Sequence, residues 1–198
     1  MVGLDRVRIV GFDSRFAGTV ASWIATPDQL FSWAGARFHY PLEERHLHEH
    51  AAAASAPHAT TSIFSAAIED RVVGHAELTA IDPVHGTTVM RRVIVDPALR
   101  RRGIGRMIVG SVLDVAFHEL RLHRVELRAF DTNLAAIALY RTIGFTVEGR
   151  LREYRRHDGL WRSALVMGML AAEWCEADHP PSRRLQASSG LTSQAITR

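Results

Sequence analysis

The sequence of 198 residues contains no lysine, and all 24 of its Lys and Arg positions are arginine. A pI of about 9.7 is typical of nucleic-acid-binding proteins, but 21 acidic residues are interleaved with the arginines and the net charge is only +3. A protein that binds a phosphate backbone concentrates its positive charge on one face. The composition therefore argues against a nucleic-acid partner.

Cysteine and long apolar runs are also scarce. Cys175 is the only cysteine, which excludes an intrachain disulfide and a cysteine-built zinc site and is typical of a reducing compartment. No apolar stretch approaches the roughly 20 residues needed to span a bilayer. Asp5, Arg6, Arg8 and Asp13 interrupt any signal-peptide core. We therefore expect a cytoplasmic protein that has no membrane partner.

With 47% hydrophobic residues, a chain of this length suits one domain with a sizeable core. We expect that domain to cover residues 1–176. From Ala177 the sequence "ADHPPSRRLQASSGLTSQAITR" is rich in Pro, Ser, Gln and Gly. This composition predicts a disordered tail over residues 177–198.

Hydrophobic periodicity and turn residues predict an α/β protein. The middle of the chain is typical of a three-stranded antiparallel meander. Strands are predicted at 7–12, 60–68, 71–81, 87–95, 123–130, 145–156 and 160–170, and helices at 14–24, 26–38, 103–120 and 133–143.

The sequence "DPALRRRGIGRM", from Asp96 to Met107, joins the buried strand pattern "VIVDP" to the start of a helix. The first N–H groups of a helix and the positive end of its dipole favour an anion. Gly103 and Gly105 would let a phosphate approach the backbone closely. The pattern Gly-x-Gly is common, however, and taken alone it is better explained by a glycine-relaxed turn with solvent-facing arginines.

The helix "NLAAIALYRTIGF" carries the second indication of a ligand. Asn133 and Tyr140 are two helical turns apart and share one face, with the small Ala136 between them. An elongated ligand could pass Ala136 and meet the Tyr140 hydroxyl. Alternatively, Tyr140 is a core residue with its hydroxyl at the rim.

Together, "VIVDP", Arg100-x-x-Gly103-x-Gly105 and "NLAAIALYRTIGF" resemble the GCN5-related N-acetyltransferase (GNAT) superfamily. The resemblance covers roughly Val7 to Ala172 and is greatest to the branch that acetylates ribosomal-protein N-termini, spermidine and small amines. It implies a mixed, mostly antiparallel sheet of about seven strands flanked by helices. It also implies acetyl-CoA as co-substrate, no metal, and a small-molecule amine or a protein N-terminus as acceptor.

The resemblance further implies roles for individual residues. The backbone amides from Arg101 to Arg106 would hold the coenzyme pyrophosphate, and Tyr140 would donate a proton to the departing thiolate. Strand main-chain groups and Asn133 would contact the pantetheine arm from its two sides. The implied coenzyme-binding residues are Val93, Ile94, Val95, Arg100, Arg101, Arg102, Gly103, Ile104, Gly105, Arg106, Asn133, Ala136 and Tyr140.

The general base is less clearly indicated. Members of this family carry a glutamate on the strand leading into "VIVDP", where this chain has "TTVMRR". Glu77, on the polar face of the preceding strand, could act as base directly or through water. It could equally form a cross-strand ion pair with Arg91, or water alone could take the proton. The missing carboxylate also leaves a non-catalytic acyl-CoA-binding or regulatory domain as an alternative.

Each of two polar clusters can be interpreted either as a solvated surface or as a binding site. His46, His48 and His50 favour a solvated helix over a metal site, because only two of them share a helix face. Four arginines around the last hairpin are typical of a solvated strand face, or they attract an acidic acceptor. These arginines are Arg150, Arg152, Arg155 and Arg156.

The segment "FSWAGARFHYPL" either lines the acceptor pocket or docks the first helices on the sheet. Its aromatic residues are Phe31, Trp33, Phe38 and Tyr40. Cys175 lies outside every coenzyme motif, so we expect direct attack by the amine without a covalent enzyme intermediate. The sequence leaves the oligomeric state open, a homodimer included.

Overall fold

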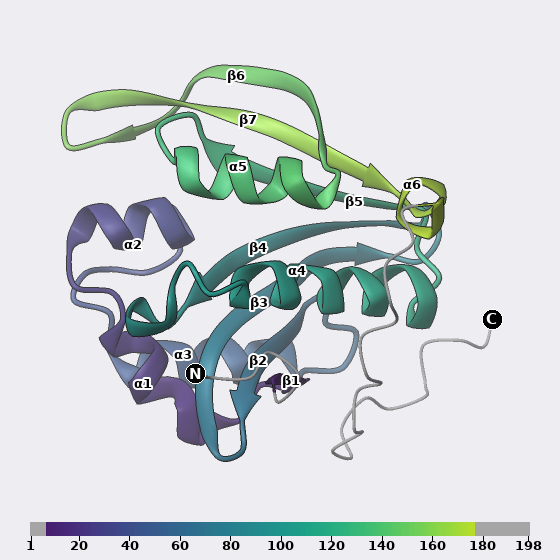
Figure 1. The fold of residues 1–198 in the computed structure, drawn as a ribbon. Helices are drawn as coiled ribbons and strands as arrows, with labels where there is room; N and C mark the ends of the chain where they lie inside the picture. The colour runs from purple at the N-terminus through teal and green to yellow at the C-terminus, as the bar shows by residue number, and fades with distance from the viewer. Residues whose placement is uncertain (1–6, 177–198) are drawn as a thin grey trace.

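Seven strands form one sheet in the computed structural model of the protein, which describes residues 7–176 (Figure 1). Their order across the sheet is β1-β2-β3-β4-β5-β7-β6, and only β4 and β5 are parallel neighbours. The predicted mixed, mostly antiparallel sheet is therefore confirmed. The strands are β1 (Val7–Gly11), β2 (Ser62–Ile68), β3 (Arg71–Asp82), β4 (Thr87–Val95), β5 (Arg124–Phe130), β6 (Thr146–His157) and β7 (Leu160–Leu170).

Helices cover both faces of the sheet (Figure 1). On one face α4 and α5 pack over a large hydrophobic core, and on the other α1, α2 and α3 enclose a smaller one. None of the helices within residues 7–176 combines the length and hydrophobicity that a bilayer crossing requires. The helices are α1 (Ala17–Ser22), α2 (Pro27–Ala34), α3 (Glu44–Ala54), α4 (Ile104–Asp114), α5 (Leu134–Ile143) and α6 (Ala171–Glu176), with 3₁₀ turns at Ser14–Phe16 and Pro97–Leu99 and a π turn at Val115–Glu119.

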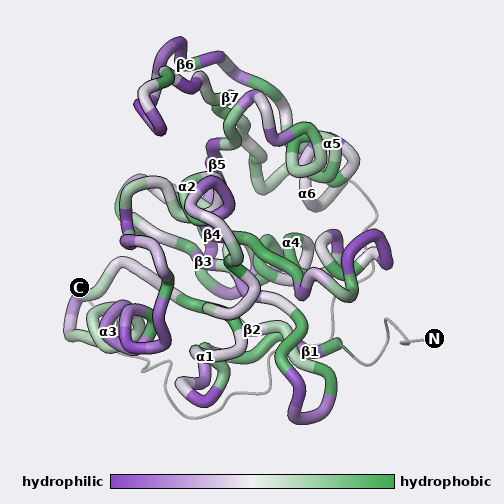
Figure 2. The backbone as a smooth tube through the Cα atoms, turned by 90° about the vertical axis from the view of Figure 1, so that its left-hand side faces the viewer, coloured by the Kyte–Doolittle hydropathy of each residue, from purple (hydrophilic) through white to green (hydrophobic). Residues whose placement is uncertain are grey.

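The larger core forms because α4 presents one apolar face to the sheet. Ile104, Ile108, Val112 and Val115 are all buried, as their helical spacing predicts. Hydrophobic residues follow the middle strands and α4, whereas hydrophilic residues predominate along β6 and α3 (Figure 2). Packing of α4 against β3 and β4 fixes the position of its N-terminus relative to the sheet.

Strands β4 and β5 pair over only part of their length. Their register runs from Thr87 opposite Arg124 to Met90 opposite Leu127. Within residues 7–176, β4 then continues to Val95 and β5 to Phe130 without pairing with each other. The sheet therefore splits between these two strands, and the edge of β4 that faces β5 keeps free backbone groups.

Some element boundaries differ from those predicted. The helix expected at 26–38 ends at Ala34, because Gly35 adopts a left-handed φ of 61°. The helix expected at 103–120 changes to a π turn after Asp114. The helix at 171–176 was not predicted, and the tail at 177–198 lies outside the described residues.

Candidate active site

The residue before α4, Gly103, is its N-cap, which has a φ of 81° and makes no side-chain cap hydrogen bond. The first N–H groups of the helix therefore have no side-chain cap as acceptor. A Cβ on Gly105 would lie 3.2 Å from Leu139 Cδ2 of α5 and 3.6 Å from Val95 Cγ2 of β4. Three elements thus converge on this helix end, where the sequence predicts a phosphate site.

The arginines around this turn differ in their contacts. The side chains of Arg100, Arg101 and Arg102 make no hydrogen bond or ion pair with any residue between 7 and 176, and the residues themselves are exposed. Arg106 instead donates from Nη1 to the carbonyl oxygen of Thr142 at 2.8 Å and ties α4 to the end of α5. The triplet is therefore available to an anion, whereas the Arg106 side chain holds two helices together.

The predicted pantetheine-binding stretch lies beside the split in the sheet. Val93 and Val95 pack against the core under α4, and Ile94 faces the opposite core under α1 to α3. On its other edge β4 pairs with β3, Gly74 lying opposite Val95. The edge facing β5 is the free one, so it can accept an added extended ligand.

On α5, Asn133 is the N-cap residue, and its Oδ1 accepts a hydrogen bond from the Ala136 N–H at 3.2 Å. Its Nδ2 donates to Ser32 Oγ at 3.4 Å. Asn133 thus has a clear structural role in starting the helix. Contact of Asn133 with a pantetheine arm stays a prediction.

Tyr140 lies further along α5, 9% exposed, with its ring edge-to-face against Phe145 at 5.7 Å. Burial raises the pKa of Tyr140 to about 12. Its hydroxyl has no hydrogen-bond partner among residues 7–176. The side chain is therefore a neutral phenol whose proton is not committed to a neighbour.

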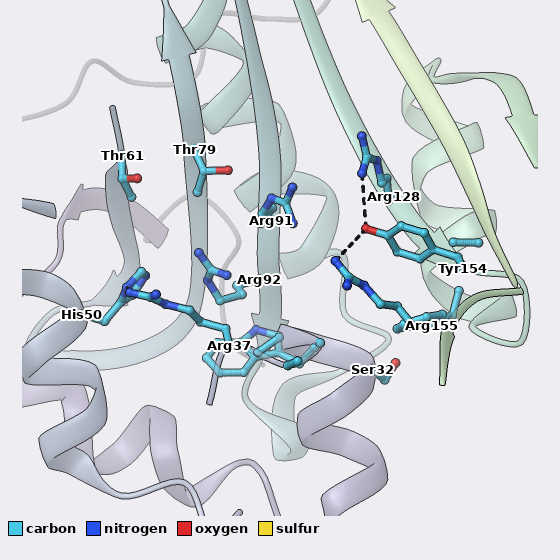
Figure 3. A pocket seen from close by; sticks show the side chains of 16 residues that line it. Ser32, Arg37, His50, Thr61, Thr79, Arg91, Arg92, Arg128, Tyr154 and Arg155 are labelled. Carbon is cyan, nitrogen blue, oxygen red and sulfur yellow. Dashed lines mark hydrogen bonds between the residues drawn. The ribbon is translucent and has the colours of Figure 1, made fainter. Parts of the chain in front are cut away.

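A cavity of about 560 Å³ opens on the other face of the sheet, beneath α2 and α3. Arg91 and Arg92 of β4 and Arg128 and Phe130 of β5 line it, directly after the last β4–β5 pair. Figure 3 shows these side chains together with others from α2, α3 and β6. The cavity therefore meets the split in the sheet from the side opposite α4.

A β-bulge explains why two consecutive arginines line one cavity. The β3–β4 register shifts between His75 and Glu77, and Arg92 has a positive φ of 51°. Glu77 does lie opposite Arg91, as predicted, but the ion pair forms with Arg92, whose Nε and Nη2 donate to Glu77 at 2.6 and 2.5 Å. The predicted Glu77–Arg91 ion pair is therefore wrong, because the bulge turns the next side chain toward Glu77.

Glu77 is fully buried, and its oxygens also accept hydrogen bonds from His50 Nε2 at 2.9 Å and His75 Nε2 at 3.1 Å. Burial alone would raise the pKa of Glu77, but the bonds from His50, His75 and Arg92 outweigh it and hold the pKa well below its usual range. A shielded carboxylate with a low pKa is a weak base. These contacts argue for Glu77 as the anchor of the Arg92 side chain.

The three histidines of α3 have different environments. His46 and His48 lie on the exposed side, where His46 Nδ1 accepts from the Glu43 N–H. The expected solvated helix is wrong for His50, which is buried because the face of α3 that carries Leu47 and His50 packs inward. In the part of the chain that the structure describes, no group of three or more His, Cys, Asp or Glu side chains is placed to hold a metal.

The aromatic residues of the segment "FSWAGARFHYPL" both dock α2 on the sheet and contribute to the cavity wall. Phe31 stacks on Phe130 at 4.8 Å and on His157 at 4.0 Å, which docks α2 on the sheet. Trp33 lines the cavity and contacts the rings of His75 and Phe38. Tyr40 is largely exposed, and its hydroxyl donates to the Ala25 carbonyl.

Sequence reasoning missed Arg37, Arg91, Arg92, Arg128 and Tyr154 as cavity residues. One signal was present: "TTVMRRVIV" has two adjacent arginines, and a regular strand places the side chains of adjacent residues on opposite sides. The bulge resolves that irregularity. Of the four arginines around the last hairpin, Arg155 reaches the cavity, whereas Arg150 pairs with Asp131 at 2.7 Å.

Comparisons with known proteins agree with this arrangement. The family model described as "Acetyltransferase (GNAT) family" matches residues 27–145. The chain is 33% identical over 108 residues to the probable N-acetyltransferase YjcK of Bacillus subtilis, covering 54% of this chain and 59% of that protein. It is 28% identical over 103 residues to the L-amino acid N-acetyltransferase AaaT of Escherichia coli, covering 52% and 64%. The chain thus spans less than two thirds of the length of these curated relatives.

Among solved structures, the spermidine N-acetyltransferase of Vibrio cholerae in complex with CoA and spermine is similar, with a TM-score of 0.75. The sequence identity is 21%, and the match covers 86% of this chain and 98% of that chain. The two proteins share their fold over nearly the whole described part of this chain.

Proposed function

The chain belongs to the acetyltransferase (GNAT) family, and we propose that it transfers the acetyl group of acetyl-CoA to a primary amine. The observation that carries this proposal is the split between β4 and β5 after Met90 and Leu127. The uncapped end of α4 and Tyr140 lie on one side of the sheet, and the cavity lies on the other. Two substrates can therefore approach one point from opposite faces.

The residues at the α4 end fit the coenzyme. The N–H groups of residues 103–106 would bind the pyrophosphate, and Arg100, Arg101 and Arg102 would add positive charge. The free edge of β4 at Val93–Val95 would hold the pantetheine arm as an added strand, and one amide there would stabilise negative charge on the carbonyl oxygen. Acetyl-CoA supplies the acetyl group as a thioester.

The chemistry we propose is direct attack by the amine. The amine nitrogen forms a bond to the thioester carbonyl carbon, and the carbon–sulfur bond breaks. Tyr140 donates its hydroxyl proton as negative charge builds on the sulfur, and it regains a proton from solvent. Burial that raises the pKa of Tyr140 also strengthens the affinity of an adjacent thiolate for a proton.

The proton lost by the amine goes to water in the cavity. Glu77 is fully buried and does not line the cavity, and its carboxylate is hydrogen-bonded to His50 and Arg92, which do. Its proposed part is to position Arg92. Names of similar proteins include acceptors as different as L-amino acids and spermidine, so the acceptor proposed at this level is a primary amine.

A Tyr140→Phe variant tests the proposal. Loss of the proton donor should lower kcat by about 100-fold while leaving the KM for acetyl-CoA nearly unchanged. Because the pKa of Tyr140 is about 12, kcat of the wild type should show no alkaline decline from this residue below about pH 11. Release of free thiol from acetyl-CoA, measured against a panel of amines, gives the rates.

Tyr40→Phe is the matched control, since that phenol is exposed and outside the cavity wall. Equal rates for Tyr140→Phe and the wild type at every pH would remove Tyr140 as the donor. Tight CoA binding without thiol release from any amine would instead support the non-catalytic acyl-CoA-binding alternative.

A further inference from the structure

The cavity wall has an unusual charge composition. Five arginines line it, and it includes no aspartate or glutamate of residues 7–174 (Figure 3). They come from the segment after α2, from β4, from β5 and from β6. The arginines are Arg37, Arg91, Arg92, Arg128 and Arg155.

Two of the five positive charges are balanced by carboxylates that do not themselves line the cavity. Arg92 is paired with the buried Glu77, and Arg128 Nη2 lies 3.0 Å from Glu126 Oε1. These two arginines therefore contribute little net charge to the cavity.

The other three lack a carboxylate partner among residues 7–176. The polar contact of Arg37 is with His50 Nδ1 at 3.2 Å, and that of Arg155 is with the Tyr154 hydroxyl at 3.5 Å. Arg91 makes no hydrogen bond or ion pair with any residue in that range. Burial lowers the pKa of Arg91 from its ordinary value, and the guanidinium groups of Arg92 and Arg128 add to this effect while Tyr154 and Glu126 oppose it. The wall therefore carries uncompensated positive charge.

Tyr154 lies within this group of arginines. Its oxygen accepts from Arg128 Nη1 at 3.3 Å and from Arg155 Nη2 at 3.5 Å, and the Arg155 guanidinium also lies 4.8 Å from the ring centre (Figure 3). Burial raises the pKa of Tyr154, but the bonds from Arg128 and Arg155 outweigh it and lower the pKa overall. Because its oxygen already accepts twice, its O–H is left to donate into the cavity.

The coenzyme does not account for this charge. No residue between 93 and 107, the range that contains the predicted pyrophosphate site, lines the cavity. The cavity lies under α2 and α3, on the face of the sheet away from α4. An anion bound here is therefore a separate chemical group from the coenzyme phosphates.

We propose that the acceptor amine carries a carboxylate or phosphate group, and that Arg91 and Arg155 bind this group and select the acceptor. This inference rests on the proposed acetyl transfer. A guanidinium fork matches the oxygens of either anion, and the Tyr154 hydroxyl adds a donor. A volume of about 560 Å³ suits a small molecule. A polyamine would meet only like charge on this wall, which disfavours it as an acceptor.

The first experiment measures thiol release with acetyl-CoA at saturation and four kinds of acceptor. These are amino acids, the corresponding amides in which the carboxylate is replaced by a neutral group, an amino sugar with and without a phosphate, and spermidine. We expect kcat/KM to be at least tenfold higher for the anionic member of each matched pair, and lowest for spermidine. Comparison of amino acids with the phosphorylated amino sugar shows which anion is preferred. An acidic peptide, added as a fifth acceptor, tests a protein N-terminus.

The second experiment uses the variants Arg91→Ala and Arg155→Ala. Each should raise the KM for the anionic acceptor about tenfold or more, with little change in kcat or in the KM for acetyl-CoA. Arg156→Ala is the matched control, because Arg156 follows Arg155 on β6 but does not line the cavity. A general loss of stability would instead change kcat and the KM values for both substrates, and it would do so for the control Arg156→Ala as well.

Each outcome decides a separate question. Preference for spermidine, or equal rates with and without the anionic group, overturns this inference and leaves acetyl transfer standing. If no amine releases thiol, acetyl transfer fails, and calorimetry of the CoA-loaded protein with glutamate and with glucosamine 6-phosphate still tests the anion site. Binding that Arg91→Ala weakens supports the site; absence of binding overturns it.

Discussion

Glu77 has no contact with water, so its negative charge depends on the groups around it. His50, His75 and Arg92 each donate to its carboxylate. Since Arg37 can only donate, Nδ1 of His50 must accept from it, which places the proton of His50 on Nε2, facing Glu77. One buried carboxylate thereby fixes three side chains, of which His50 and Arg92 line the cavity.

Replacement of Glu77 by Gln should therefore lower the free energy of unfolding by about 3 kcal/mol, because it leaves the Arg92 charge buried without a partner. The pKa of Glu77 is lower in the folded protein than in the unfolded chain. Its stabilising effect is thus complete at neutral pH and declines as the pH falls below about 4.5 toward the folded pKa. Urea unfolding at pH 7 and pH 4 measures both effects.

The difference in stability between wild type and Glu77→Gln should shrink at the lower pH. Glu126→Gln provides a control, because Glu126 is a partly exposed carboxylate that also pairs with arginines. Equal stability of Glu77→Gln and wild type at pH 7 would show that the buried ion pair is not needed to hold the strands together.

At the scale of single elements, the left-handed backbone at the start of α4 is the feature that prepares the coenzyme site. Gly103 has a φ of 81°, where a Cβ costs about 1 kcal/mol. Gly103→Ala should lower stability by this amount and shift the N–H groups that follow it. Loss of one such bond to phosphate should weaken CoA binding about tenfold, measured by calorimetry.

The variant Gly159→Ala is the control for Gly103→Ala, because it introduces the same kind of backbone strain away from the proposed coenzyme site. Gly159 has a φ of 76° in the β6–β7 turn, and a Cβ there would meet no atom within 4 Å. The Gly159→Ala variant should lose about as much stability as Gly103→Ala, but its affinity for CoA should be unchanged. If the two variants bound CoA equally well, the α4 end would not be the pyrophosphate site.

Sequence patterns predicted elements whose signals are local. The spacing of Ile104, Ile108 and Val112 identified α4, and the tight turn "DPVHG" between β3 and β4 placed Glu77 opposite Arg91. The bulge at Arg92 depends on how β3 and β4 fit together, so a single strand does not reveal which arginine meets Glu77. The burial of His50 likewise depends on which face of α3 packs on the sheet.

The same limit applied to the candidate site. Gly103, Gly105 and Tyr140 stand in motifs with fixed spacing, so the order of residues along the chain is enough to select them. The cavity residues come from several elements far apart in the chain, and no short motif contains them. Of the hairpin arginines only Arg155 lines the cavity, and the β6–β7 register shifts between Leu151 and Arg155, which the spacing of residues in a single strand does not reveal.

At the scale of the whole molecule, a net charge of +3 conceals a strongly uneven distribution. The chain has 21 acidic residues, yet none of those between positions 7 and 174 lines the cavity, where five arginines meet. Composition argued against a basic face for nucleic acid, while giving no indication of concentrated charge inside one pocket. The effect of this charge on an acceptor should depend on salt.

Salt screens charges over a length that falls from about 10 Å at 0.1 M to about 3 Å at 1 M. With acetyl-CoA held at saturation, the KM for an anionic acceptor should rise several-fold over this range, and the KM for its uncharged amide should stay nearly constant. Arg91→Ala and Arg155→Ala should flatten the dependence, whereas Arg156→Ala should preserve it, because Arg156 is outside the cavity wall. A KM for the anionic acceptor that falls with salt would mean that the acceptor meets a repulsive field, which five arginines without a lining carboxylate cannot produce.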